Sequence, residues 1–336
     1  MGGGTAIVEA LANGRRAVGT DVNSLAVFLA RTKCTVLTSR DVAALREWAD
    51  ATVPQLAYHD ALVSTETICA RRSHNLEMPP VRPVKKFIAL ALESLSDLPS
   101  VRAQGFARAV LLNVSQLALN GRRSFEPLPA FRERVSSTTH RMIEGADEFR
   151  QRLHANGLSI QDPQLLHVSA SLLATQPPFA NGDRADLVVT SPPYPGIHVL
   201  YHRWQVDGRK ETPAPYWIAA CQDGNGAGYY SFAERRRASD DDYFRESLKT
   251  LRAVRAVTKR GGIVIQMLAF AEPRRQLRRY LGNMEAAGFR ELRLDEQLGL
   301  ARHRRIWRGV PGRQWHASLK GQASGSREVV LVHEAI

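Results

Sequence analysis

A proline-rich turn follows the apolar run at residues 185–189 and consists of Ser191, Pro192, Pro193 and Tyr194. Each proline fixes φ at about −65° and has no N–H to donate, so the carbonyls around it are held outward as rigid acceptors. The Ser191 hydroxyl and the Pro192 carbonyl can accept the two hydrogens of an NH2 group, while Tyr194 stacks on a flat heterocycle. This set of groups suits the binding of a planar amine. A plain turn at the end of a strand is the alternative for this stretch alone.

A second set of residues with chemical potential lies at the amino end of the chain. Gly2, Gly3, Gly4 and Thr5 open an apolar helical stretch, and a short strand then ends in Asp21. Glycine lets backbone amides approach a ligand closely, and a carboxylate after a strand can accept bonds from a ribose diol. Glycine loop, helix, strand and acid form half of a nucleotide-type βαβ unit. The strand that should precede the glycines is absent, so we expect a sheet truncated at its first strand.

The charge of the chain points to nucleic acid as a partner. Its 336 residues include 46 Lys and Arg but only 33 Asp and Glu, which gives a net charge of +13. Most of the excess is arginine, which binds phosphates through two hydrogen bonds. A solvated basic surface is the alternative.

Two long stretches, residues 195–237 and 299–315, mix basic and aromatic side chains and match neither a helix nor a strand pattern. Long loops within a domain are usually functional, and this mixture suits phosphate contact together with base stacking. Trp307 and Trp315 are alternatively core anchors beneath a basic hairpin. The predicted nucleic-acid contacts are Arg203, Arg209, Lys210, Arg304 and Arg305.

Other classes of protein are disfavoured by the sequence. No run of about 18 apolar residues exists to span a bilayer, and the amino terminus lacks the pattern of a signal peptide, so we expect a cytoplasmic protein without a membrane partner. The three cysteines, Cys34, Cys69 and Cys221, have no CxxC spacing, and the ten histidines include no HExxH. We therefore expect reduced thiols and no metal site.

The periodicity divides the chain into three regions. Residues 1–36 form the cofactor-type half unit, residues 37–159 have helical periodicity and form an insert suited to target recognition, and residues 160–336 return to alternating strands and helices. Strands that alternate with helices predict an α/β fold with a doubly wound, mainly parallel sheet. Basic residues between the helices of the insert either meet phosphates or are solvated loop charges.

Local signals place the individual elements. Expected helix starts are Asn23 or Ser24, Ser39 and Ser100, and an expected helix end is Asn120. The expected strands cover residues 16–21, 165–168, 186–190, 263–267 and 328–332, and the later helices cover residues 239–260 and 273–288.

Taken together, these motifs resemble the amino-methyltransferases of DNA, which methylate cytosine N4 or adenine N6. Gly2, Gly4 and Thr5 match the glycine loop of that family, Asp21 matches its ribose acid, and residues 191–194 match its (Ser/Asp/Asn)-Pro-Pro-Tyr turn. The resemblance covers about residues 1–36 and 160–336, and it implies a Rossmann-like sheet, S-adenosylmethionine as cofactor and double-stranded DNA as substrate. A cognate restriction endonuclease becomes a candidate partner. The Asp-Pro-Phe that precedes the glycines in the family is missing here.

The chemistry of the turn agrees with that resemblance. An exocyclic amine on a base is a poor nucleophile because its lone pair is delocalised into the ring, and acceptors at Ser191 and Pro192 would turn that lone pair toward a sulfonium methyl. The base must flip out of the duplex to reach Tyr194. Serine at the first position is, by resemblance, more common in cytosine-N4 enzymes, which makes N4 the expected target. Adenine N6, an RNA amine, or a cofactor-dead protein that only binds DNA remain the alternatives.

Overall fold

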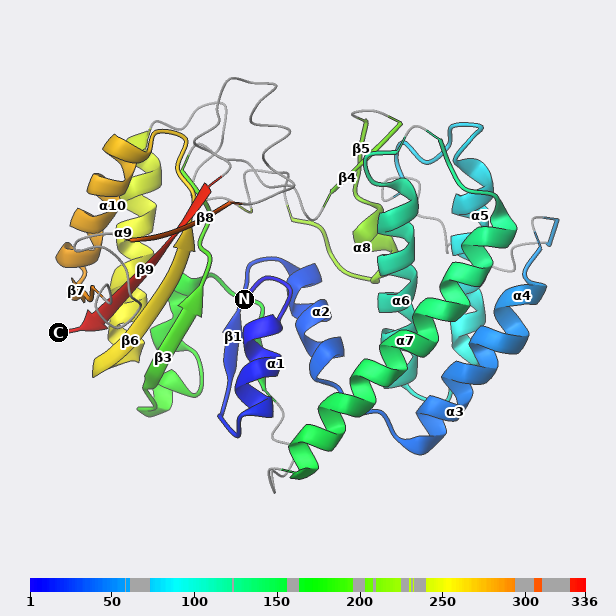
Figure 1. Ribbon diagram of the computed structural model, residues 1–336, viewed down its shortest axis with the longest axis horizontal. Coiled ribbons are helices and arrows are strands. Elements are labelled where there is room, and N and C mark those ends of the chain that lie inside the picture. Colours follow the sequence, from blue (N-terminus) through cyan, green and yellow to red (C-terminus); the bar gives the residue numbers. More distant parts are fainter. Residues whose placement is uncertain are drawn as a thin grey trace.

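The main sheet, β3, β6, β7, β8 and β9, lies at one end of the molecule and a group of helices, with β4 and β5 beside them, lies at the other, with the amino terminus between them (Figure 1). The computed structural model describes residues 1–57, 59–60, 73–122, 124–155, 163–195, 203–207, 210–224, 230, 232, 240–293, 305–309 and 327–336. Because strands and helices share the strand-rich end, the α/β class predicted from the sequence is confirmed.

The amino-terminal half unit forms as predicted. Helix α1 (Thr5–Ala12) begins after Gly4, strand β1 (Val18–Thr20) follows, and helix α2 (Ser24–Cys34) begins after the predicted cap Asn23. The Asn23 side chain accepts a hydrogen bond from the Leu25 amide at 3.0 Å, which satisfies one open N–H of the first turn. Strand β1 pairs in parallel with β2 (Gln164–Leu166), so two sequence-distant regions join in one sheet.

The main sheet has the strand order β3, β6, β9, β7, with β8 paired to β9. Its strands are β3 (Ala185–Thr190), β6 (Thr258–Leu268), β7 (Phe289–Glu291), β8 (Ile306–Gly309) and β9 (Arg327–Ala335). Strand β6 is parallel to β3 and antiparallel to β9, and β7 is also antiparallel to β9. Strands β3, β6 and β7 therefore share one direction, and β9 runs against them.

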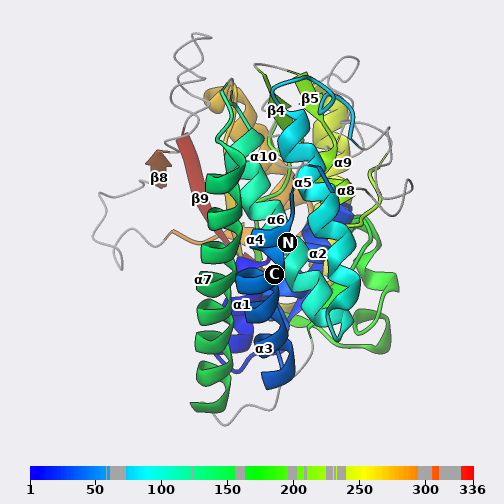
Figure 2. The same cartoon turned by 90° about the vertical axis from the view of Figure 1, so that its right-hand side faces the viewer.

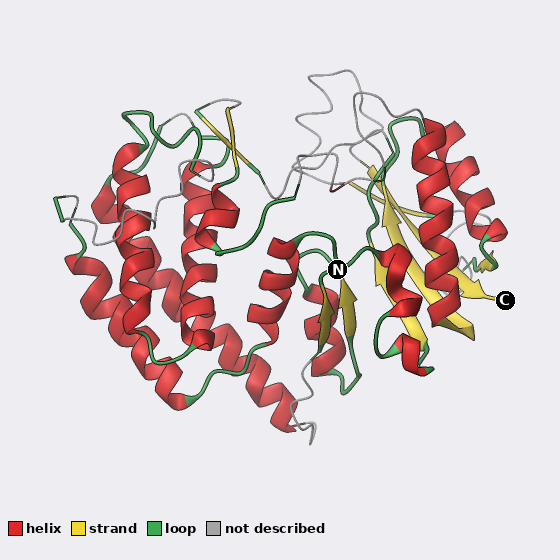
Figure 3. Ribbon diagram, turned by 180° about the vertical axis from the view of Figure 1, so that it is seen from behind, coloured by secondary structure: helices red, strands yellow, loops and turns green. Residues whose placement is uncertain are grey.

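Helices α9 (Asp240–Val257) and α10 (Pro273–Ala286) cover one face of this sheet, as the view from behind in Figure 3 shows. Phe244 of α9 and Met284 of α10 pack with Val264 and Leu331 of the sheet in one hydrophobic cluster. Acidic residues begin α9 and a basic residue lies in its last turn, which complements the helix dipole. Two 3-10 turns, Ala170–Thr175 and Phe179–Asn181, connect β2 to β3.

Strand β6 begins earlier than the sequence predicted. The expected start was Ile263, after the glycine pair, whereas the observed strand starts at Thr258. The register jumps there, because Ala185 lies opposite Thr258 while Leu187 lies opposite Ile263. The two glycines thus lie in a bulge within the strand and not in a turn before it.

The described residues of the region predicted to be helical, residues 37–159, form helices joined by turns. This region contains α3 (Ser39–Glu47), a π-helical turn (Trp48–Thr52), α4 (Val53–Gln55), α5 (Arg82–Glu93), a 3-10 turn (Ser94–Asp97), α6 (Val101–Leu119) and α7 (Leu128–Ala155). Ser100 caps α6 as predicted, whereas α3 is capped by Thr38, in a capping box with Asp41, and not by Ser39. Figure 2 shows α7 running the length of this region. The boundaries of the three predicted regions stay predictions.

The two stretches predicted to be irregular contain regular structure. Residues 203–224 include β4 (Trp204–Val206), the antiparallel β5 (Lys210–Thr212) and α8 (Ala214–Ile218), and residues 306–309 form β8. The fully buried Trp204 and Tyr216 pack into the core of the helical region, so this part of the chain packs with the helices. Strands of three or four residues are too short for a pattern of alternation to reveal them.

Candidate functional site

The predicted cofactor residues meet at the carboxyl end of β1. Asp21 follows the strand, and its Oδ2 accepts hydrogen bonds from the Gly2 amide at 2.9 Å and from the Met1 amino group at 3.2 Å. Its Oδ1 accepts from the Asn23 amide at 2.9 Å. The structure therefore brings the glycine loop and the predicted ribose acid into direct contact.

Backbone geometry explains why glycine occurs in this loop. Gly4 has φ +79°, and a Cβ there would lie 2.6 Å from the Ala30 Cα, so α1 can pack on α2 only with glycine at this position. A Cβ on Gly2, which has φ +55°, would meet no atom of the described residues within 4 Å. Among these residues there is accordingly open space beside Gly2, next to the Asp21 carboxylate.

Asn23 connects this corner to the helical region. It is 1% exposed, and its Oδ1 also accepts from the Tyr216 hydroxyl of α8 at 3.1 Å. Its Nδ2 is buried and makes no hydrogen bond to any residue that the structure describes, which is costly for a polar group. Burial, together with the bond to Tyr230, raises the pKa of Tyr216 far above its usual range, so this hydroxyl stays protonated and able to donate. The sequence indicates Asn23 only as a helix cap.

The predicted catalytic turn follows β3 at the carboxyl edge of the main sheet. Ser191 is exposed, while Pro192, Pro193 and Tyr194 are half-buried. The Pro193 carbonyl accepts a hydrogen bond from the Tyr243 hydroxyl of α9 at 2.7 Å. Burial raises the pKa of Tyr243 well above its usual range, which keeps this donor protonated. Helix α9 therefore holds the turn through the Pro193 carbonyl, which is one residue beyond the Pro192 carbonyl that is predicted to bind an amine.

A second brace holds Tyr194. Its hydroxyl donates to Glu328 Oε1 at 2.9 Å, and Glu328 Oε2 accepts from Arg308 Nε at 2.9 Å. Glu328 is 3% exposed, so its charge is balanced inside the protein by Arg308. Sequence analysis identified Glu328 only as the start of a strand and missed both braces, since Tyr243 and Glu328 lie far from the turn in the sequence.

Three of the five predicted nucleic-acid contacts lie among the described residues, and each forms an ion pair within the chain. Arg203 pairs with Asp223 at 2.5 Å, and Lys210 pairs with Asp207 at 3.1 Å. Arg305 donates two hydrogen bonds to Glu291, at 2.6 and 2.9 Å. Lys210 has the most exposed side chain of the three, at 51%.

The other two, Arg209 and Arg304, lie outside the described residues, as does Trp315. Trp307 on β8 is partly buried and packs against the core of the main sheet, in agreement with the core-anchor alternative.

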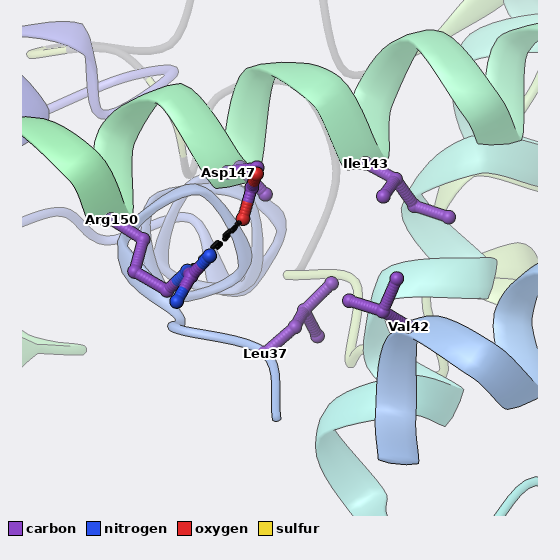
Figure 4. A pocket seen from close by; sticks show the side chains of 6 residues that line it. Leu37, Val42, Ile143, Asp147 and Arg150 are labelled. Carbon is purple, nitrogen blue, oxygen red and sulfur yellow. Dashed lines mark hydrogen bonds and ion pairs between the residues drawn. The ribbon is translucent and has the colours of Figure 1, made fainter. Parts of the chain in front are cut away.

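A shallow pocket lies in the helical region, away from both motifs. Leu37, Val42 and Ile143 line it together with Asp147 and Arg150, which pair with each other at 2.6 Å (Figure 4). Because its two charged side chains neutralise each other, the pocket offers little to a charged ligand. Within the described ranges, no three His, Cys, Asp or Glu side chains come together as a metal site requires, and no helix is both long and apolar enough to cross a bilayer.

No protein-family model matches the sequence, and no curated protein matches it.

Proposed function

We propose that this protein is an S-adenosylmethionine-dependent methyltransferase that acts on an exocyclic base amine in double-stranded DNA. The observation that carries the proposal is the pairing of two motifs at strand ends. The Gly2 amide contacts Asp21 at the end of β1, and the Ser191 to Tyr194 turn follows the end of β3. In open α/β sheets, ligands bind outside the carboxyl ends of the strands.

The residues around Asp21 fit the proposed cofactor. A carboxylate at the end of β1 can accept bonds from a ribose diol, and the space beside Gly2 lets a ligand approach the backbone of the loop. When bound, S-adenosylmethionine supplies an electrophilic methyl group on a sulfonium. Gly2, Gly3, Gly4, Thr5 and Asp21 would hold it on the β1 side of the site.

The turn after β3 would hold the amine. The Pro193 carbonyl is engaged by Tyr243, whereas no described residue donates to the Pro192 carbonyl, and Ser191 is exposed. Ser191 and Pro192 are thus the acceptors available to the two hydrogens of an NH2 group, and they would orient its lone pair for attack. Tyr194, fixed through its hydroxyl, presents a ring for stacking of the flipped base.

Cytosine N4 is the proposed position of methylation, with adenine N6 as the alternative within the same chemistry. Serine is short and uncharged, so Ser191 accepts one amine hydrogen while its own proton goes elsewhere. The net charge of +13 supports a phosphate-bearing substrate. An RNA amine would use the same groups, and a restriction nuclease as partner remains part of the proposal.

One observation favours a second candidate, a DNA-binding protein that has lost its cofactor. Both Asp21 oxygens already accept hydrogen bonds, Oδ2 from the Gly2 amide and Oδ1 from the Asn23 amide. A ribose diol must compete with these two amides for the carboxylate. The two candidates differ in whether cofactor binds at all.

Isothermal titration with S-adenosylmethionine separates them. The proposal expects binding by the full chain and at least a tenfold loss of affinity in Asp21→Asn, with no loss in Asp147→Asn, a matched change on α7. Thermal unfolding of each variant checks that the fold is kept. Absence of binding by the unaltered chain, with duplex DNA still bound in fluorescence anisotropy, would favour the second candidate.

A further inference from the structure

The first turn of α2, directly after Asp21, packs against a segment that lies far away in the sequence. The Ser24 hydroxyl donates to the Gln222 carbonyl at 2.5 Å. The hydroxyl of Tyr216, which is fully buried on α8, donates to Asn23 Oδ1 at 3.1 Å. These two bonds span 198 and 193 positions of the sequence. The segment from α8 to Gln222 is therefore a neighbour of the predicted ribose acid.

Asn23 connects Tyr216 to the Asp21 carboxylate. The backbone amide of Asn23 donates to Asp21 Oδ1 at 2.9 Å, and the Gly2 amide holds the other carboxylate oxygen at 2.9 Å. The side-chain Oδ1 of Asn23 accepts from the Leu25 amide at 3.0 Å as well as from Tyr216. A shift of Asn23 would therefore change the orientation of the Asp21 carboxylate.

The two donors to Asn23 Oδ1 restrict the orientation of its side chain. An amide oxygen has two lone pairs, and the Leu25 amide and the Tyr216 hydroxyl each use one. A flipped amide would place its NH2 group against the Leu25 N–H, which cannot accept a hydrogen bond. Because Asn23 is 1% exposed, water offers little compensation for a lost contact. The Tyr216 hydroxyl thus selects one orientation of Asn23.

Tyr216 is held in turn by a neighbouring tyrosine. Its ring stacks on that of Tyr230 with a centroid distance of 6.3 Å and an interplanar angle of 21°. The Tyr230 hydroxyl donates to Asp223 Oδ1 at 2.8 Å, and Asp223 Oδ2 pairs with Arg203 at 2.5 Å. A continuous set of contacts therefore runs from Arg203, a predicted nucleic-acid contact, to the corner that contains Asp21.

We propose that Tyr216 is a positioning residue, which acts through Asn23 to orient the Asp21 carboxylate toward a ribose diol. The inference rests on the proposed function for the identity of the ligand, whereas the contacts that carry it lie within the chain. It gives α8, a helix that packs with the helical region, a part in holding the cofactor. A role in core packing alone is the alternative, and the ring of Tyr216 without its hydroxyl would be enough for that role.

The experiment compares Tyr216→Phe, which keeps the ring and removes the donor, with Tyr280→Phe as the matched control. Tyr280 is also buried, and its hydroxyl donates to Gln266 of the main sheet. The ligands are S-adenosylhomocysteine and its 2′,3′-dideoxy form, which lacks the ribose diol, and isothermal titration measures both affinities. Asp21→Asn serves as the reference for loss of the carboxylate. Without ligand, the thermal midpoint and the hydrogen exchange of the Asn23 amide are measured in each variant.

Tyr216→Phe is expected to weaken binding of S-adenosylhomocysteine by about threefold or more and to leave binding of the dideoxy form unchanged. Asp21→Asn should show the same selectivity with a larger loss. Exchange of the Asn23 amide should be at least about fivefold faster in Tyr216→Phe, and Tyr280→Phe should change neither the affinities nor this exchange.

Equal weakening of both ligands in Tyr216→Phe would assign the tyrosine to packing and overturn the inference. Unchanged exchange of the Asn23 amide would overturn it as well, whether or not a ligand binds. If the unaltered chain binds neither ligand, the proposed function fails together with the ribose part of the inference. The exchange of the Asn23 amide then still decides whether Tyr216 holds this corner.

Discussion

The hydroxyl of Tyr194 donates to Oε1 of Glu328 at 2.9 Å, and this bond ties the turn after β3 to the beginning of β9. Glu328 is buried, and its other oxygen accepts from the Arg308 guanidinium, a charged donor that makes a strong hydrogen bond. The bond holds the hydroxyl end of the Tyr194 side chain against β9. In the proposed function, this contact would help to place the aromatic ring beside Ser191 for the flipped base.

Loss of the Tyr194–Glu328 hydrogen bond should lower the stability of the fold, and substitutions at the two residues should not have additive effects. Tyr194→Phe keeps the ring but removes the donor, and we expect the free energy of unfolding to fall by about 1 to 2 kcal/mol. A double-mutant cycle with Glu328→Gln, measured by urea denaturation, should give a coupling energy of at least about 0.5 kcal/mol. Strictly additive effects of the two substitutions would contradict the interaction.

The turn itself should be required for methyl transfer. Ser191→Ala and Tyr194→Ala each remove one proposed contact to the flipped base, so both should lose transfer of labelled methyl groups to DNA by at least tenfold. Ser191 is exposed, and its replacement should leave the thermal midpoint nearly unchanged. Rates equal to that of the unaltered chain in both variants would exclude the turn as the catalytic element.

Binding to duplex DNA should weaken steeply with salt, because each phosphate contact contributes about 0.9 to the slope of log affinity against log salt concentration. Joint removal of Arg304 and Arg305 should flatten that slope by up to about 2. Arg305 also pairs with Glu291, so Glu291→Gln is the control that breaks the pair and keeps the cation. If Glu291→Gln changes the salt slope as much as the double arginine variant does, the change comes from loss of the Arg305–Glu291 pair and not from loss of phosphate contacts. An affinity for duplex DNA that does not change with salt concentration would argue against DNA as the substrate.

Acid should destabilise the fold through His333 on β9. Burial lowers the pKa of this imidazole from 6.5 to about 4; nearby Glu291 opposes the shift, and Arg305 adds to it. Between these values the unfolded chain binds a proton that the folded chain does not, so this contribution is fully present above pH 6.5 and is lost as the pH falls toward 4. The expected loss is on the order of 2 to 3 kcal/mol.

Urea denaturation between pH 4 and 7 of the unaltered chain and of His333→Gln measures this difference. Other groups titrate over the same range in both proteins, so only the difference between them reports on His333. Equal losses in the two proteins would show that this histidine does not carry the effect.

The parts of the fold that depend on neighbours in the sequence were predictable. Asn23 caps α2, Ser100 caps α6, and Asn120 ends α6, because each of these signals acts within one helical turn. The choice of Thr38 over Ser39 was not predictable from residue type, since both can cap a helix. It is decided by Asp41, whose carboxylate accepts from the Thr38 amide and hydroxyl.

The parts that depend on distant neighbours were not predictable. Tyr194 and Glu328 are 134 positions apart, and they meet only because β9 enters the sheet beside β6. The same topology brings Arg308 on β8 to Glu328, within a stretch predicted to be irregular. The sequence predicts which groups at the turn could do chemistry, whereas the contacts that hold these groups follow from strand order.

The central claim is most directly tested by mass spectrometry of nucleosides from duplex DNA incubated with this protein and S-adenosylmethionine. The account predicts N4-methylcytosine, absent when Ser191→Ala replaces the unaltered chain. N6-methyladenine alone would overturn the choice of base and leave the proposed mechanism standing. DNA without any methylated nucleoside, after incubation with protein that binds both the cofactor and the duplex, would contradict the claim that this chain is a DNA methyltransferase.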